Sequence, residues 1–340
     1  MARVAGGPAC CSHEWPGDET AVMTPTEGGA LNRGAALASV SVALILSALK
    51  IYAVWRTGSI AMLGSLADTG LDLIASIVTL IAVHVSAQPA DHEHRFGHGK
   101  AEALAALFQV SMISIAAVGI MIRSIERIGG AGEPTAIGYG IGVSLFAMAL
   151  TVLLVWYQGR IIRATGSVAI SADNLHYRSD LALNASVIAA LVLEAMLHVH
   201  GADALFGLAI GLWLAWGAWK TAVHAIDQLM DKEWPVAKRE QFLAVASRHP
   251  ALAGIHDLRT RTSGSQDLVQ FHMWVDPAMT MAKVHEVMDE VEAALLAEFP
   301  GIEVLIHPDP EGHVDIKDPI AGRDAHDLIA DLKAAEDSRK

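Results

Sequence analysis

Two aspartates, Asp68 and Asp72, lie four residues apart in the largely apolar segment LADTGLDLIA. Residues at positions i and i+4 share one face of a helix, so these carboxylates are expected one turn apart. A second segment, ADNLHYRSDLAL, places His176 and Asp180 at the same spacing. Three carboxylates and one imidazole suit a tetrahedral divalent cation such as zinc. We therefore predict a central metal site made of Asp68, Asp72, His176 and Asp180.

The alternative is a structural role for these side chains. Protonated carboxylic acids can hold helices together through hydrogen bonds, and a single histidine in a helix is more often a packing residue. Two matched pairs on two helices favour the metal site. Arg178 lies two positions from both His176 and Asp180, so it points to a different face, and the sequence identifies no partner for it.

A second dense group of polar residues follows in PADHEHRFGHGKAE, residues 89–102. Its metal-binding side chains fall within eight residues: Asp91, His92, Glu93, His94 and His98. The segment is either a solvated polar loop or a loop that folds around one exposed metal ion. In the second interpretation the ligands are Asp91, His94 and His98, beside two glycines.

A third set of candidate ligands is spread over the last third of the chain. Surface histidines at strand ends are common, but strands that converge at one end would bring this set together. We therefore favour a metal cluster made of His256, His272, His285, His307 and Asp309.

The composition indicates which elements must position these residues. The chain has 340 residues, of which 53% are hydrophobic, and a mean hydropathy of +0.38, which is too apolar for an ordinary soluble protein. A helix needs about 20 apolar residues to cross a bilayer. The sequence predicts six such spans, at about residues 34–55, 59–86, 101–124, 135–158, 168–198 and 203–226. Asp68 and Asp72 then lie about 15 Å into the second span, where a carboxylate usually marks an ion or proton path.

Six spans place both ends of the chain on the same side of the membrane. Basic residues near span ends indicate the cytoplasmic side. Arg33, Arg95, Lys100, Arg160, Arg163 and Lys232 fall on one side, against Arg56, Arg123 and Arg127 on the other. Both termini are therefore expected in the cytoplasm.

After residue 230 the pattern changes to that of a small soluble domain. A helix at 236–250, strands at 253–264 and 267–276, a second helix at 280–300 and a strand at 302–310 give the order αββαβ. The predicted organisation is a disordered tail at 1–30, a membrane domain at 31–230, a metal-binding domain at 231–310 and a polar tail at 311–340. One short helix is expected around DAHDLIADLKAAED in that last tail.

The remaining composition limits the class of protein. Only Cys10 and Cys11 are present, so there is no disulfide framework, and residues 1–30 have no apolar segment typical of a cleavable signal peptide. Cys10 and Cys11 with His13 could capture metal, but a plain tail is the simpler interpretation. The net charge of −13 comes from acidic residues gathered in the water-exposed parts, and no nucleic-acid partner is expected.

Taken together, these segments resemble the cation diffusion facilitator family, in particular its bacterial zinc and ferrous-iron efflux branch. The resemblance runs from about residue 31 to 310. It is carried by TGS, DTGLD, QPADHEHRFGHGKAEALAAL, LHYRSD, GADALFGLAIG, HDLRTRTSG and IHPDP. Arg178, the N-terminal extension and the tail beyond Pro310 depart from the pattern, and none of them removes a ligand.

The resemblance implies an α-helical membrane protein with six transmembrane helices and a cytoplasmic α+β domain of αββαβ order, shaped like a metallochaperone. It implies a homodimer in a bacterial inner membrane that exchanges a divalent cation for protons by alternating access. Zinc is the expected ion, with cadmium or ferrous iron as alternatives. The resemblance also implies that Lys100 pairs with Asp231 and couples the two domains.

The charge of the central site supports the same mechanism. An empty site with three carboxylates should take up protons, and a metal that binds only deprotonated ligands releases them. No catalytic residues are expected, because no HExxH motif of an intramembrane metallohydrolase occurs. A membrane-bound metal sensor or scaffold that does not transport is the remaining alternative.

Overall fold

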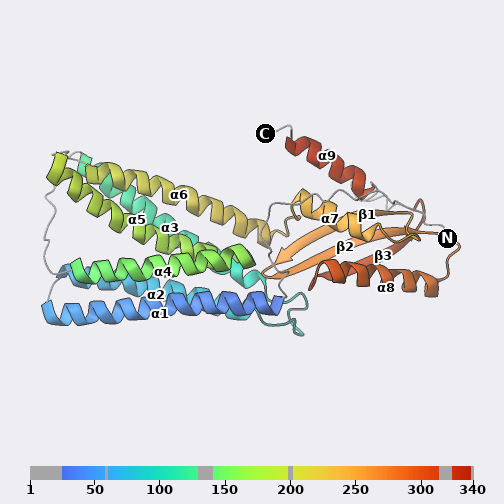
Figure 1. The fold of residues 1–340 in the computed structure, drawn as a ribbon, viewed down its shortest axis with the longest axis horizontal. Helices are drawn as coiled ribbons and strands as arrows, with labels where there is room; N and C mark the ends of the chain where they lie inside the picture. The colour runs from blue at the N-terminus through green and yellow to red at the C-terminus, as the bar shows by residue number, and fades with distance from the viewer. Residues whose placement is uncertain (1–24, 58–59, 129–140, 198–201, 314–323, 338–340) are drawn as a thin grey trace, which may run out of the picture.

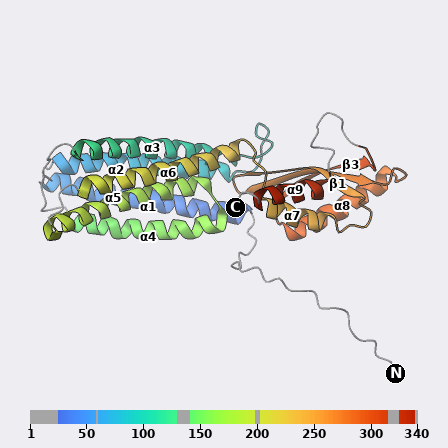
Figure 2. The same cartoon turned by 90° about the horizontal axis from the view of Figure 1, so that it is seen from above.

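The computed structural model describes residues 25–57, 60–128, 141–197, 202–313 and 324–337, which form a long helical bundle followed by a smaller mixed domain (Figure 1). The bundle helices run along the long axis of the molecule in both views (Figures 1 and 2). Their bounds are α1 Pro25–Thr57, α2 Ile60–Ser86, α3 Lys100–Ile128, α4 Ile141–Thr165, α5 Val168–Leu197 and α6 Ala202–Leu229.

Four helices are long and apolar enough to cross a membrane: they are the segments Thr26–Arg56, Ser65–Ser86, Lys100–Glu126 and Ala204–Leu229. These correspond to the first, second, third and sixth predicted spans. Helix α4 and helix α5 lie in the same bundle but do not meet that criterion within the described residues. Six spans therefore remain a prediction.

Small residues let the membrane helices approach closely, as is common where lipid offers no hydrophobic driving force. A Cβ atom at Gly207 of α6 would lie 2.3 Å from Ser124 Oγ of α3. At Gly211, one turn later, it would lie 2.5 Å from the Met121 side chain. Helices α3 and α6 thus form one tightly packed pair.

The C-terminal domain confirms the predicted αββαβ order. Its elements are α7 Val236–Ala246, β1 Gly254–Ser263, β2 Gln266–Val275, α8 Met281–Glu298 and β3 Glu303–Pro310. Strands β1 and β2 are antiparallel and joined by a tight turn in which Gly264 has φ +61°. Strands β2 and β3 are parallel, which requires a crossover, and α8 supplies it. Thr280 caps α8 by accepting a hydrogen bond from the Lys283 backbone N–H.

The helices cover only one face of this sheet. Phe271 and Met273 of β2 point into a core that also contains Phe242 of α7 and Leu295 of α8. The alternating residues of β2 point to the opposite face, where Gln270 is exposed. The open face is therefore available to polar side chains, and it carries most of the predicted cytoplasmic ligands.

Both predicted tails differ from expectation. Helix α1 begins at Pro25, so residues 25–30 are helical rather than part of a disordered tail, and residues 1–24 with Cys10 and Cys11 lie outside the described residues. The short C-terminal helix is confirmed as α9, Ala325–Asp337. Ala325 and Ile329 of α9 join the core of the C-terminal domain, so this domain does not end at Pro310.

The two parts meet where the α2–α3 loop contacts the turn between β1 and β2. A Cβ atom at Gly99 would lie 2.1 Å from the Ser263 carbonyl oxygen, so only glycine fits between loop and turn. The predicted pair is present, with Lys100 Nζ 3.0 Å from Asp231 Oδ1. Arg261 of β1 adds a second cation, 3.4 Å from Asp231 Oδ2. Bundle and soluble domain are therefore joined by tight backbone contact and by a shared ion pair.

We predict that Gly99→Ala weakens this junction. The clash is with backbone, so side-chain rotation cannot relieve it, and overpacking of this kind costs about 1 to 3 kcal/mol. Thermal unfolding of the purified protein should show a lower midpoint, and the β1–β2 turn should be cut faster by protease. Gly119→Ala in α3 is the matched control, because no atom lies within 4 Å of a Cβ there. Equal stability of both variants would contradict the proposed packing.

Candidate metal centres

The central group joins α2 to α5. His176 Nε2 lies 2.8 Å from Asp72 Oδ1 and 3.8 Å from Asp180 Oδ2. One ligand atom from each of these three residues lies within 4.8 Å of the others. All three side chains are partly buried in the bundle. The arrangement can hold one cation between two helices.

The fourth predicted ligand, Asp68, is not part of this close group. It lies on α2 one turn before Asp72, as its spacing requires, and its side chain is exposed. Lys50 of α1, which the sequence did not single out, donates hydrogen bonds to the Ser65 carbonyl and to Thr69 Oγ1 in the same part of α2. Because Asp68 lies outside the close group, its role as a ligand stays a prediction. Lys50 places a cationic side chain near the site.

Two candidate ligand atoms of the central group also lie within hydrogen-bond distance of each other. The 2.8 Å contact between His176 Nε2 and Asp72 Oδ1 is a hydrogen bond, and one of the two atoms must carry its proton. A cation that binds both atoms has to displace that proton.

A buried polar network lies next to the central group on α5, and it was not predicted from the sequence. Asp173, fully buried and one turn before His176 on α5, accepts hydrogen bonds from Ser39 Oγ at 2.6 Å and from Gln158 Nε2 at 2.7 Å. Tyr177 contacts Ser76 Oγ of α2 at 3.0 Å. The network ties α5 to α1, α2 and α4. The sequence feature that could have indicated this network is Asp173 itself, a further aspartate in the predicted fifth span, four residues before Tyr177.

The loop between α2 and α3 does bring Asp91, His94 and His98 together. Asp91 Oδ1 lies 3.4 Å from His94 Nδ1, and Asp91 Oδ2 lies 3.2 Å from His98 Nε2. A hydrogen bond from the His94 backbone N–H lowers the pKa of the Asp91 carboxyl. Desolvation opposes this shift, but the Glu93 backbone N–H and the nearby His98 and His94 leave the pKa below its ordinary value. An anionic carboxylate beside two imidazoles, at an exposed turn, is a suitable set of ligands for a divalent ion.

In the C-terminal domain, three predicted ligands meet on the open face of the sheet. Asp309 Oδ2 lies 3.2 Å from His256 Nε2 and 2.8 Å from His272 Nδ1. His307 lies beside them, with Nε2 3.4 Å from Asp309 Oδ1. This proximity follows from strand register, since His256 pairs with His272 and His272 pairs with His307.

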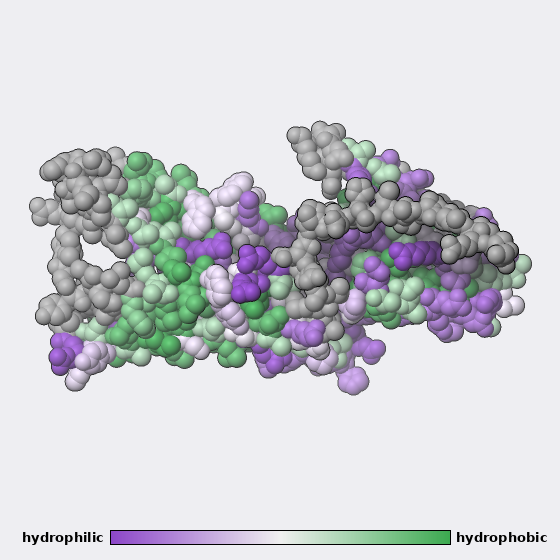
Figure 3. Space-filling view, viewed as in Figure 1, coloured by the Kyte–Doolittle hydropathy of each residue, from purple (hydrophilic) through white to green (hydrophobic). Residues whose placement is uncertain are grey.

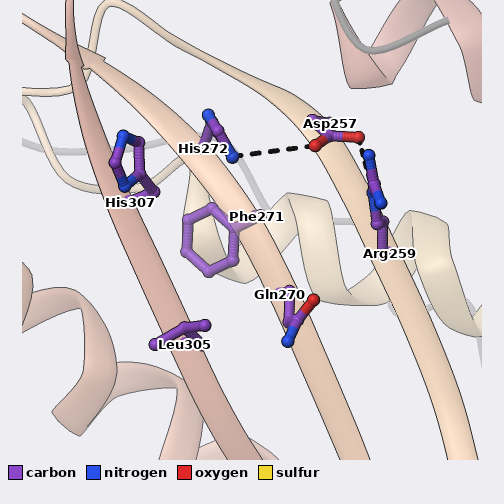
Figure 4. A pocket seen from close by; sticks show the side chains of 7 residues that line it. All are labelled: Asp257, Arg259, Gln270, Phe271, His272, Leu305 and His307. Atoms are coloured by element: carbon purple, nitrogen blue, oxygen red, sulfur yellow. Dashed lines mark hydrogen bonds and ion pairs between the residues drawn. The ribbon is translucent and has the colours of Figure 1, made fainter. Parts of the chain in front are cut away.

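Two residues change the predicted composition of that cluster. His285 lies on α8, is exposed, and is not part of the close group within the chain; its contact is with Asp289 at 3.9 Å. Asp257 was missed, and its Oδ2 lies 3.6 Å from His272 Nε2 (Figure 4). Asp257 has φ +47° at an irregularity in β1, which turns its carboxylate toward the cluster. A local backbone bulge of this kind leaves no clear signal in the sequence.

The electrostatics of the cluster suit a metal ion. Burial, together with the neighbouring His272, lowers the pKa of His256 below its ordinary value. Burial opposes ionisation of Asp309, but the hydrogen bond from His272 and the nearby histidines lower the pKa of this carboxyl overall. His256 Nδ1 is also buried without a hydrogen-bond partner in the described part of the chain. A carboxylate whose ionised form is favoured, beside imidazole nitrogens, is a ligand set that suits a divalent cation.

An open cavity of 320 Å³ lies next to this cluster. Figure 4 shows His272, His307 and Asp257 at one end of it and Gln270 and Leu305 at the other. Arg259 completes the rim and donates a hydrogen bond to Asp257 Oδ1 at 2.9 Å. Solvent and ions can therefore reach the cluster from the open face of the sheet.

Comparisons with known proteins identify the family of this chain. A family model described as the cation efflux transmembrane domain matches residues 36–230, and one described as the cytoplasmic domain of cation efflux proteins matches residues 234–311. The cation-efflux pumps FieF of Salmonella arizonae and Salmonella typhimurium are each 40% identical over 291 residues, covering 85% of this chain and 95% of the relative.

Two solved structures match the C-terminal domain. The metal-bound C-terminal domain of the CzcD transporter from Thermotoga maritima is 26% identical, with a TM-score of 0.22 over 23% of this chain and 94% of that one. The zinc form of the putative zinc transporter CzrB is 35% identical, with a TM-score of 0.23 over 25% of this chain and 98% of that one.

We predict that Asp309→Ala disrupts the cytoplasmic cluster, because Asp309 contacts three histidines. Zinc affinity of this site should fall by at least about tenfold, a loss that even outer-shell substitutions at metal sites can cause. The measurement is calorimetric titration of the full chain carrying Asp91→Asn and Asp180→Asn, which weaken the other two groups. Asp276→Asn, an exposed carboxylate beyond the end of β2, is the control. Unchanged affinity in Asp309→Ala would rule out this assignment.

Proposed function

Because the chain belongs to the cation diffusion facilitator family of cation efflux proteins, we propose that it exports a divalent metal ion, zinc in the first place, in exchange for protons. Membership rests on family models that together match residues 36–230 and 234–311. The relatives named above are cation-efflux pumps aligned over nearly their whole length. Cation efflux is thus the activity of the family, and the ion and its coupling are the proposal.

The observation that carries the proposal is the group Asp72, His176 and Asp180 between α2 and α5. Nitrogen and oxygen ligands without sulfur suit zinc and other borderline divalent ions, so cadmium or ferrous iron are the alternative cargoes. Asp68, one turn from Asp72, is the proposed fourth ligand. A site shared by two helices can open to one side of the membrane or the other when those helices tilt.

Proton exchange follows from the hydrogen bond between His176 and Asp72. The bond holds a proton where the metal binds, so loading the cation releases it and unloading the cation takes one up. An empty site with bare carboxylates would be costly inside a bilayer, which opposes return of the transporter without protons. Export is the expected direction where the proton gradient points inward.

The other two groups are proposed to regulate or supply this site. The loop group Asp91, His94 and His98 is exposed and beside the domain junction, which suits delivery or sensing of metal. The cytoplasmic cluster is proposed to tighten a homodimer when it binds zinc. His285 is exposed, and it is proposed as an additional zinc ligand in that dimer. The proposed setting is a bacterial inner membrane with six spans and both termini in the cytoplasm.

We predict that Asp72→Asn and Asp180→Asn each abolish zinc-dependent proton exchange. Each removes a charged ligand from the central group, and the rate in sealed proteoliposomes should fall by at least about a hundredfold. His94→Ala is the comparison, since the loop group lies apart from α2 and α5; that variant should transport more slowly but still bind zinc centrally. Near-normal exchange by Asp72→Asn would refute the central site. Zinc binding without any exchange in the wild type would favour a sensor or scaffold.

We further predict that His176→Asp changes the preferred ion. Replacing imidazole by carboxylate makes the central group all-oxygen, which suits manganese better than zinc. Uptake of zinc and manganese should be measured side by side in the same vesicles, and the ratio should shift toward manganese. His313→Asp, at an exposed position after the end of β3, is the control and should leave the ratio unchanged. An unaltered ratio in His176→Asp would argue against His176 as a ligand.

A further inference from the structure

A groove of 390 Å³ lies between α4, α5 and α6, outside all three metal groups. Its polar lining comes from each of the three helices and consists of Arg163, Ser171, Asn174, Arg178, Lys220 and Thr221. The lining contains three cations and no carboxylate. It includes Arg178, the residue for which neither the sequence nor the central site provides a role.

The three cations have no anionic partner in the part of the chain that the structure describes. No ion pair or hydrogen bond joins Arg163, Arg178 or Lys220 to another described side chain, and all three are exposed. In Figure 3 a hydrophilic area interrupts the hydrophobic face of the bundle between α6 and α4. A cationic groove inside an apolar surface is costly unless something covers it with negative charge.

The groove opens at the end of the bundle that faces the soluble domain. Arg163 lies two residues before α4 ends at Thr165, next to the short link to α5. Arg178 lies ten residues into α5 and Lys220 nine residues before the end of α6, or about 15 Å along each helix. Long cationic side chains at that depth extend toward the interface. Lys220 also lies over the ring of Trp216, 5.3 Å from its centre, and tryptophan is typical of the headgroup region.

We propose that this groove binds the phosphate headgroup of an anionic phospholipid. Arginine guanidinium groups can donate two parallel hydrogen bonds to phosphate oxygens, and lysine adds a point charge. The surrounding exposed apolar side chains of α4 and α6, such as Leu153 and Trp213, suit the acyl chains. Basic pockets between membrane helices on the cytoplasmic side are a known way to hold anionic lipid. A divalent cation would be repelled, so the groove is not an entry path for the cargo.

The position of Arg178 connects this lipid to transport. Arg178 is two residues from both His176 and Asp180, on another face of the same two turns of α5. A headgroup held jointly by α4, α5 and α6 would fix α5 against its neighbours while its other face carries the metal ligands. Removal of the lipid should therefore alter the transport rate without removing a ligand from the central group.

The test is native mass spectrometry of the purified full chain with equal amounts of phosphatidylglycerol and phosphatidylcholine. We expect wild type to retain phosphatidylglycerol selectively. Attraction of about 1 kcal/mol per cation corresponds to about fivefold in affinity for each one removed, and to about a hundredfold for the triple variant Arg163→Gln, Arg178→Gln, Lys220→Gln. Arg160→Gln is the matched control, since Arg160 is exposed on α4 but does not line the groove. Zinc binding at the central group should persist in every variant, which shows that each is folded.

Three outcomes would overturn the proposal. Equal retention of both lipids by the wild type would mean that headgroup charge is not recognised. An equal loss of phosphatidylglycerol affinity in Arg160→Gln and Arg178→Gln would mean that any surface cation attracts the lipid to the same extent. Displacement of the bound lipid by millimolar inorganic phosphate would identify a soluble anion, rather than lipid, as the occupant.

Discussion

The cost of placing a carboxylate inside a helix bundle governs the membrane part of this protein. A charged group away from water must find hydrogen bonds or an opposite charge, or bind a cation. Asp72 and Asp180 lie close to His176. Asp173 accepts hydrogen bonds from Ser39 and Gln158. Glu102 accepts hydrogen bonds from Asn32 and Ser167. Apart from Asp180–His176, which lies within α5, these contacts join separate elements: α2 to α5, α5 to α1 and α4, and α3 to α1 and to the link between α4 and α5. The same constraint therefore gathers the candidate metal ligands and holds in place the helices that carry them.

The two kinds of buried carboxylate differ in what their partners allow. Asp173 is enclosed by neutral donors from three other helices, and no solvent reaches it. Asp72 and Asp180 face a histidine and remain partly exposed, so a cation can replace a proton there. The first arrangement makes a rigid frame, and the second makes an exchangeable site. Asp173 lies about one turn before His176 on α5, so the frame is adjacent to the site.

Outside the bundle, the arrangement depends on close backbone approach at the junction. Gly99 lets the α2–α3 loop touch the β1–β2 turn, and the same loop carries the exposed group around Asp91. Lys100 and Arg261, from the two domains, share Asp231. A movement of the soluble sheet would thus reach the start of α3 without passing through a flexible linker. The sheet also carries the cytoplasmic cluster, so the parts that bind metal are mechanically connected.

The sequence by itself determined most of the elements and the spacing of the candidate ligands, because hydrophobic length, period and i, i+4 spacing are local properties. They predicted the αββαβ order and the pairs Asp68–Asp72 and His176–Asp180, whereas helix starts and the packing of α9 were not predicted. Only the tertiary structure placed Asp173 against Ser39 and Gln158. It turned Asp257 toward His272 and left His285 apart from the cytoplasmic cluster. It also gathered Arg163, Arg178 and Lys220 in one groove. Such contacts join residues far apart in the chain or depend on a local bulge, so helix packing and strand register decide them, and neither can be read from spacing alone.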